Sequence, residues 1–470
     1  MPRFNVGKTL WGCICVLALL AITAQSWAAI EFFGTAKIKP TYYTNFDFND
    51  DTNDAPIANE GGLTKGEQIR AELRLGWKAS GEKWKIKMIA EADVQYEKDT
   101  ADRSYYVGAT KEAQPNSGAE FGIERVELLY KFLPQLELET GWDIRFLDIQ
   151  SGGLLYGDDH PFFGFRGKLS DTTKYELLYI PIQNRVSLAT DPMESSEAND
   201  WRVYSLKVGQ KFGGMTVSPI LALSDNDSMN AEVLYYGVEA VGKIGMFKPS
   251  FEILCADGEF DDAAGGADIS AFAFYAGVEA TVNKAFNPYV AFRYTSGDDD
   301  ASDDDVEGWI GIVDIGRFSG LMGMDGGILG EDLSQSYGAT LYSYSPERTS
   351  KNHVYGGISN RGSGDNPGQK IVAFGTKGDL SELVPNLTYK TQAFFIWYDE
   401  TDNLANVANP AKSVDDYAGT SFDLQLKYAF SKEFSVDYIF STFIPGQGME
   451  DQLDSDDNAY VNMLTLAWSY

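Results

Sequence analysis

The chain is poor in the residues that crosslinks and catalysis use. It has three cysteines in 470 residues, and Cys13 and Cys15 fall in an N-terminal segment that we expect to be removed, which leaves Cys255 without an intrachain disulfide partner. The two histidines, His160 and His353, have no serine motif of a hydrolase beside them, so we predict no enzymatic activity. No Cys-x-x-Cys-His motif occurs, and we expect no cofactor held by this chain.

Long apolar runs are lacking as well. Beyond the N-terminal segment, no stretch approaches the roughly 18 consecutive apolar residues that predict a transmembrane helix, which excludes a helical membrane protein. Basic residues are outnumbered, 38 against 69 acidic ones, and the formal net charge of −31 makes nucleic acid an unsuitable partner. A soluble protein and a β-barrel remain.

The first residues predict a cleaved signal peptide over 1–28. Arg3 and Lys8 flank a basic start, and the apolar run over 10–22 that follows is shorter than the roughly 20 residues that a bilayer requires. Ser26 and Ala28 supply the small side chains of a cleavage site. We therefore expect an exported protein whose mature part, 29–470, is a single domain.

Strict alternation of apolar and polar residues fills this mature part. From 30 to 47 one face carries Ile30, Phe32 and Ile38, and the other carries Lys37 and Lys39. Because successive side chains of a strand point to opposite faces, such a segment has one apolar and one polar face. The pattern predicts about 18 strands, with 16 as the lower estimate, at 30–47, 69–78, 84–96, 121–132, 136–147, 161–169, 174–181, 201–212, 215–224, 232–244, 248–256, 269–282, 286–295, 369–377, 387–398, 418–430, 434–443 and 458–470.

The connectors between these strands alternate in length. Short ones include 133–135, 170–172, 213–214 and 431–433, and long ones include 48–66, 98–119, 148–160, 182–200, 257–268 and 399–417. Short periplasmic turns and long extracellular loops are typical of outer-membrane barrels. We predict an all-β fold, a single transmembrane antiparallel up-and-down β-barrel. A soluble propeller or sandwich also alternates, but strands of this length in tight hairpins are long for such sheets.

The C-terminal strand carries Leu466, Trp468 and Tyr470 on one face. It resembles the C-terminal signal by which outer-membrane barrels are recognised for assembly, although many members of that class end in Phe. The strand number, the very long loop and segments such as 136–142 resemble the large porin and alginate-export barrels. The resemblance implies a water-filled diffusion channel for small hydrophilic solutes or ions in the outer membrane of a Gram-negative bacterium.

The same resemblance implies the partners: outer-membrane lipid and lipopolysaccharide, the barrel assembly machinery, and two further copies in a homotrimer. Two alternatives stay open. The barrel could be a scaffold or conduit around a partner protein such as a cytochrome, or an export channel for a polysaccharide.

Polar faces that point into the lumen would line the pore. The strands expected first along the chain place both signs of charge there: Lys37, Lys39, Arg70, Arg74, Lys85, Lys87, Glu91, Asp93, Arg125, Glu127, Arg145, Arg166 and Lys168. Farther along, Glu239, Glu252 and Glu279 stand out, which predicts a second wall that is poorer in cations.

The span 296–368 is too long for an ordinary loop, since loops beyond about 15 residues are mostly functional or disordered. It contains Trp309, Phe318 and Met322, and it starts with a run of acids: Asp298, Asp299, Asp300, Asp303, Asp304 and Asp305. One hypothesis is that part of the loop narrows the pore and sets these acids against the basic wall. The others are a solvated extracellular lobe and a calcium site, although the run lacks EF-hand spacing.

Overall fold

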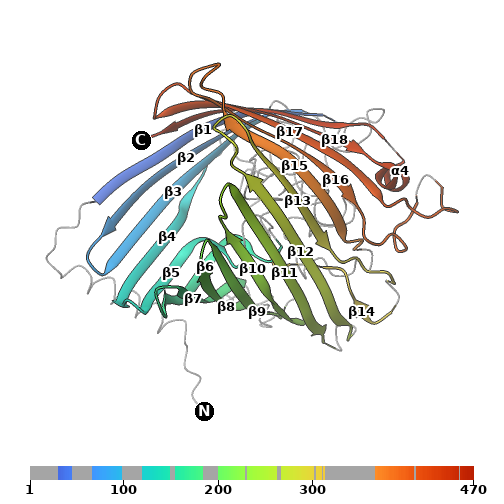
Figure 1. Cartoon of the computed structure of the whole chain (residues 1–470), viewed down its shortest axis with the longest axis horizontal. Coiled ribbons are helices and arrows are strands. Elements are labelled where there is room, and N and C mark those ends of the chain that lie inside the picture. The colour runs from blue at the N-terminus through green and yellow to red at the C-terminus, as the bar shows by residue number, and fades with distance from the viewer. Residues whose placement is uncertain are drawn as a thin grey trace, which may run out of the picture.

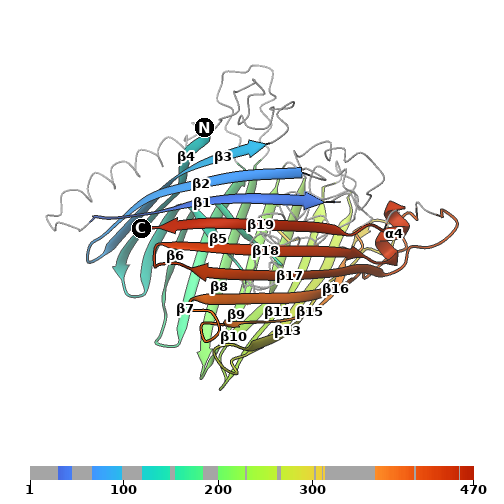
Figure 2. The same cartoon turned by 90° about the horizontal axis from the view of Figure 1, so that it is seen from above.

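The structure is a computed structural model that describes residues 30–44, 66–97, 119–148, 154–183, 200–227, 230–261, 266–300, 303–309, 311–312, 366–406, 409–454 and 456–470. The predicted signal peptide lies outside these residues. The described chain forms a closed antiparallel up-and-down barrel of 18 strands. Each strand pairs with its neighbours along the chain, and β1 closes the barrel against β19 (Figures 1 and 2). The predicted fold class and strand number are confirmed.

The strands are longer than those of most soluble sheets, as a membrane-spanning barrel requires. Their bounds are β1 Ile30–Thr44, β2 Gly66–Ser80, β3 Trp84–Glu97, β4 Ala119–Leu133, β5 Leu136–Phe146, β6 Gly157–Lys168, β7 Thr173–Gln183, β8 Trp201–Phe212, β9 Met215–Asn226, β10 Ala231–Gly242, β11 Phe247–Phe260, β12 Asp268–Ala280, β13 Asn287–Thr295, β15 Gln369–Asp379, β16 Leu387–Trp397, β17 Tyr417–Ala429, β18 Phe434–Pro445 and β19 Ala459–Ser469.

Two short elements lie outside the barrel wall. The strand β14, Asp305–Val306, pairs in parallel with the start of β12, and the helix α4, Gln447–Leu453, precedes β19. Both lie at the end of the barrel that carries the long connectors, here called the loop end. The opposite end, the turn end, has the short connectors such as Gly213–Gly214 and the C-terminus. No helix in the described part of the chain is long and apolar enough to cross a membrane.

Closure depends on a close approach at Gly34. The backbone of Tyr470 exchanges two hydrogen bonds with Gly34, at 3.2 and 3.1 Å, and its ring covers the glycine so closely that a Cβ would come within 2.5 Å of the ring. Leu464, Trp468 and Tyr470 point outward, and Trp468 stacks on Phe434 with ring centroids 4.6 Å apart. The C-terminal aromatic therefore sits on the seam of the barrel.

The outer surface is an apolar band. Large side chains such as Leu73, Leu206, Leu221 and Phe374 are 38–51% exposed and belong to the outward set of alternating positions. Cys255 shares this outward face with Phe251. A surface of this kind is stable in lipid, where every backbone group must be paired within the closed sheet.

The substitution Leu221→Arg tests this outer surface. Leu221 is 45% exposed and lies in the middle of β9, where an arginine on the lipid face costs about 2–4 kcal/mol. We expect the free energy of unfolding in lipid vesicles to fall by that amount. Phe212→Arg is the matched control, because Phe212 ends β8 beside a turn, where the cost is about 0–1 kcal/mol. Equal losses for the two variants would contradict a lipid-facing band.

Candidate functional site: the barrel interior

The inner wall of β1–β6 carries a ladder of ion pairs. Its first node is Glu72, whose carboxylate lies 3.3 Å from the Lys37 ammonium, 3.9 Å from that of Lys39 and 3.5 Å from the Arg74 guanidinium. These residues meet because inward positions on adjacent strands have Cβ atoms about 4.5–5.5 Å apart. The buried Glu72 carboxylate thus compensates the positive charges of side chains from two strands, β1 and β2.

The ladder continues through Arg74 into β3 and β4. Arg74 pairs with Glu91 and lies 3.5 Å from Glu124. A second node is Asp143 on β5, which pairs with Lys87 and lies 3.6 Å from Arg125. Acids and bases alternate at each step, so no part of this wall collects charge of one sign.

The last node is Glu139, which is fully buried. Its carboxylate lies 3.0 Å from Arg166 and 3.5 Å from Arg145. Arg145 also reaches Glu127 at 2.9 Å and stacks over the Phe162 ring at 3.9 Å. Among the described side chains of β1–β6, the ladder has seven bases and seven acids: Lys37, Lys39, Arg74, Lys87, Arg125, Arg145 and Arg166 with Glu72, Glu91, Glu124, Glu127, Glu137, Glu139 and Asp143.

The structure brings most of the predicted pore-lining residues together in this ladder. Lys85 and Lys168 instead lie exposed near the turn end of their strands. The side chains of Arg70 and Asp93 lie outside the described part of the structure. A role of any of these residues in selecting a solute stays a prediction.

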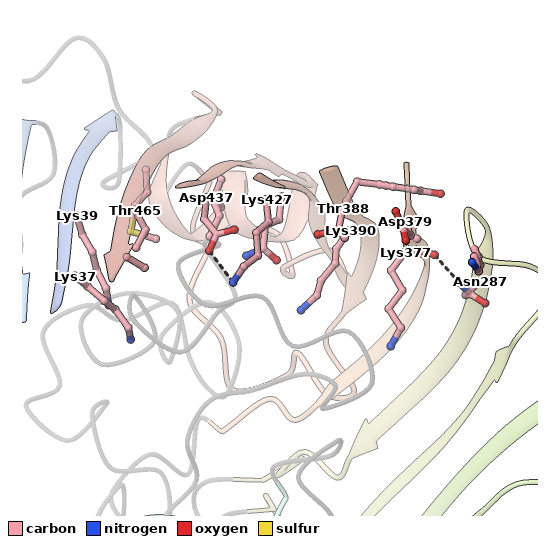
Figure 3. Close-up of a pocket in the computed structure, with 17 residues that line it drawn as sticks. Lys37, Lys39, Asn287, Lys377, Asp379, Thr388, Lys390, Lys427, Asp437 and Thr465 are labelled. Atoms are coloured by element: carbon pink, nitrogen blue, oxygen red, sulfur yellow. Dashed lines mark hydrogen bonds and ion pairs between the residues drawn. The ribbon is translucent and has the colours of Figure 1, made fainter. Parts of the chain in front are cut away.

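A pocket of about 570 Å³ opens on the inner wall near the turn end and adjoins the ladder at Lys37 and Lys39 (Figure 3). Its lining joins β1 to β13 and β15–β19 and includes Tyr389, Ile439 and Met463 beside a set of charged residues. That set has six lysines and two aspartates: Lys37, Lys39, Lys284, Lys377, Lys390, Lys427, Asp379 and Asp437. In Figure 3 the amines of Lys37, Lys377 and Lys390 extend from their strands into the same space.

Carboxylates within and beside the pocket compensate part of the positive charge of the lysines. Lys427 lies 3.4 Å from Asp437, and Lys377 lies 2.6 Å from Glu279, which also pairs with Lys248 at 2.6 Å. Cations still exceed anions in the lining, so the pocket is suited to an anionic solute with an apolar part.

The sequence analysis missed this pocket. Lys284, Lys377, Lys390 and Lys427 line it on the wall expected to be poorer in cations, and the comparison of the two walls stays a prediction. Lys377 has the same strand parity as Ile371 and Ala373, which are fully buried inside the barrel. A rule that points every apolar face toward lipid misplaces a lysine that lies on an apolar face turned inward. Val372 and Phe374 are exposed and point outward, so the positions that alternate with them on β15, including Lys377, point inward.

The inner wall at the loop end is apolar, and Trp309 and Ile312 pack against it. Val203, Tyr235, Ala273 and Phe394 are almost completely buried there. Trp309 is also buried, and its ring meets Tyr235 edge-on at 5.8 Å. Of the three large apolar residues noted in the span 296–368, Trp309 is therefore inside the barrel, and Phe318 and Met322 lie outside the described residues.

The predicted loop acids take a different position. Asp298 is buried at the rim of the barrel and accepts the Glu307 amide at 3.3 Å, whereas Asp299, Asp300 and Asp303–Asp305 are exposed around β14. Burial and the neighbouring acids Asp303 and Asp299 raise the pKa of Asp298. The opposition of these acids to a basic wall therefore stays a prediction, as does the calcium site. Within the described residues no group of three or more His, Cys, Asp and Glu side chains is arranged to hold a metal ion.

Comparison with known proteins identifies the architecture. No protein-family model matches the sequence, and no curated relative does. OccAB3 of Acinetobacter baumannii superposes with a TM-score of 0.56 at 10% identity, covering 94% of this chain and 99% of its own. This chain has the fold of the Occ and Opd outer-membrane porins.

Two structures from Pseudomonas aeruginosa extend the likeness. OccK5 (OpdH) has a TM-score of 0.52 at 12% identity and covers 93% of this chain and 98% of its own. OpdK, whose crystal structure contains vanillate, has a TM-score of 0.52 at 12% identity, with 94% and 98% covered. At these identities the likeness establishes the barrel fold, and residue roles have to be argued from the interior of this chain.

Proposed function

We propose that this chain is an outer-membrane porin that lets small hydrophilic solutes diffuse, with a preference for small anions such as aromatic carboxylates. The lysine-lined pocket carries the proposal. The pocket lining has six lysines against two aspartates, and four of these lysines, Lys284, Lys377, Lys390 and Lys427, lie outside the charge-balanced ladder on β1–β6. This local excess of cations attracts an anion. Vanillate, named with OpdK, is an aromatic carboxylate, and Tyr389, Ile439 and Met463 offer an apolar contact for such a ring.

The alternatives of a conduit and of a polysaccharide exporter are less well supported. Trp309 and Ile312 are buried inside the barrel, which leaves less room for a partner protein or a thick polymer than an empty lumen would. The outward apolar band suits outer-membrane lipid and lipopolysaccharide, and the outward Leu464, Trp468 and Tyr470 suit recognition by the assembly machinery. A homotrimer is part of the same proposal.

Planar bilayer recordings test the function. In a potassium chloride gradient, we expect the purified barrel to conduct ions with a reversal potential that indicates chloride preference. We also expect vanillate to reduce the current, and vanillyl alcohol, which lacks the carboxylate, to have a smaller effect. Absence of conduction would refute the porin proposal, and a cation preference would refute the role of the lysine pocket alone.

A further inference from the structure

The connector between β5 and β6 is organised around one buried carboxylate. The Asp148 side chain is 3% exposed and accepts three backbone amides: Leu154 at 2.8 Å, Leu155 at 3.0 Å and Tyr156 at 3.1 Å. The Leu147 amide also donates to the Tyr156 carbonyl at 3.2 Å, which closes the base of the loop. A carboxylate with three amide donors fixes the direction in which the nearby carbonyl groups point.

Two of those carbonyls hold the segment that follows β13. The Leu154 oxygen accepts the Trp309 indole N–H at 3.1 Å, and the Leu155 oxygen accepts the Ile312 amide at 2.7 Å. Gly311 fits against both oxygens, since a Cβ there would come within 2.4 Å of the Leu154 oxygen. The contact joins β5 and β6 to the end of β13 across the interior, because β7–β12 separate them around the wall.

We propose that Asp148 is the positioning residue of the channel constriction, holding the two carbonyls that fasten the Trp309–Ile312 segment across the lumen. The inference rests on the proposed porin function for its electrical consequence, although the contact itself can be tested without it. Asp148 touches no solute in this role. It acts through the carbonyls of Leu154 and Leu155.

Other charged groups near Asp148 come from three strands. Lys207 on β8 and Glu239 on β10 interact with it electrostatically, and His160 on β6 bonds the Tyr156 hydroxyl at 2.9 Å. Burial raises the pKa of Asp148, while the three amides lower it.

Single-channel recording and hydrogen exchange test the proposal together. Asp148→Ala removes all three acceptors, and we expect about twofold higher conductance with more current noise, because the crossing segment loses its attachment. Gly311→Ala should act in the same direction from the other side of the contact. Asp148→Asn keeps an oxygen for the Leu154 and Leu155 amides, so its conductance should remain near that of the unchanged chain.

Hydrogen exchange in lipid vesicles tests the positioning role of Asp148 separately from the proposed porin function. The Ile312 amide should be protected in the unchanged chain and in Asp148→Asn, and it should exchange faster in Asp148→Ala. Glu82→Ala, which removes an exposed carboxylate from the turn between β2 and β3, is the control and should change neither measurement. If the unchanged barrel fails to conduct but the exchange pattern holds, the porin function fails and the positioning role stands. Unchanged conductance and protection in folded Asp148→Ala, together with unchanged Gly311→Ala, would overturn the inference.

Discussion

Neutralising Lys377, Lys390 and Lys427 together should shift the barrel strongly toward cations. The three lysines extend into one pocket, and each unit charge contributes about 1 kcal/mol to a solute charge roughly 4 Å away even at the dielectric constant of water. The triple substitution to glutamine should therefore lower the anion-to-cation permeability ratio by at least about tenfold at low salt. The reversal potential in a salt gradient measures this ratio, and vanillate should also lose its block.

Salt and a matched variant control this experiment. The effect should shrink as the salt concentration rises, because charges in a water-filled pocket are screened. Lys432→Gln removes an exposed lysine from the turn between β17 and β18, outside the pocket, and should leave the reversal potential unchanged. If the triple variant kept the original selectivity, the pocket would not be the filter.

Glu139→Gln should give the largest loss of stability within the charge ladder. Glu139 is fully buried between Arg166 and Arg145, and removing one partner from a buried ion pair costs about 3–5 kcal/mol because the remaining charge loses its compensation. Arg145 keeps Glu127, Arg166 keeps Glu137, and the carboxylate of Glu176 on β7 remains beside the substituted position, so the lower end of this range is expected. Denaturant unfolding, followed by tryptophan fluorescence in vesicles, measures the change.

Glu31→Gln is the matched control for the ladder. Glu31 pairs with Lys78 at 2.8 Å, but both side chains are more than half exposed, and such pairs contribute about 0–1 kcal/mol. A loss at Glu31 as large as that at Glu139 would mean that burial does not decide the strength of these pairs. A neutral Glu139→Gln would mean that the ladder tolerates an uncompensated arginine.

Local sequence was sufficient for the barrel itself. Alternation has a period of two residues whatever the strand's neighbours are, so β1, β8 and β19 could each be recognised within a few residues of their ends. Polar positions on β1–β6 also predicted Arg74, Glu127 and Arg145 on one wall, because each strand turns its polar set of alternating positions toward the same side of the sheet. Which acid pairs with which base depends on cross-strand register, which alternation does not fix.

Polarity failed as a guide where the interior is packed. On β15 and β16 the inward positions include Ile371 and Phe394 near the loop end and Lys377 and Lys390 near the turn end. The same face is thus apolar against packed chain and cationic along the pocket. A rule that assigns one polarity to each face of a strand is therefore wrong for one half of β15 and of β16.

The sequence by itself determined a long-stranded all-β barrel with an apolar exterior, since each strand's pattern records only which face meets lipid. The tertiary structure decided the features proposed for function. Closure of β1 on β19 brings Lys37 into one pocket with Lys427, and the Asp148 turn meets Trp309 across the lumen. Both arrangements join residues far apart in the chain, and only the register and curvature of the closed sheet set the distances between them.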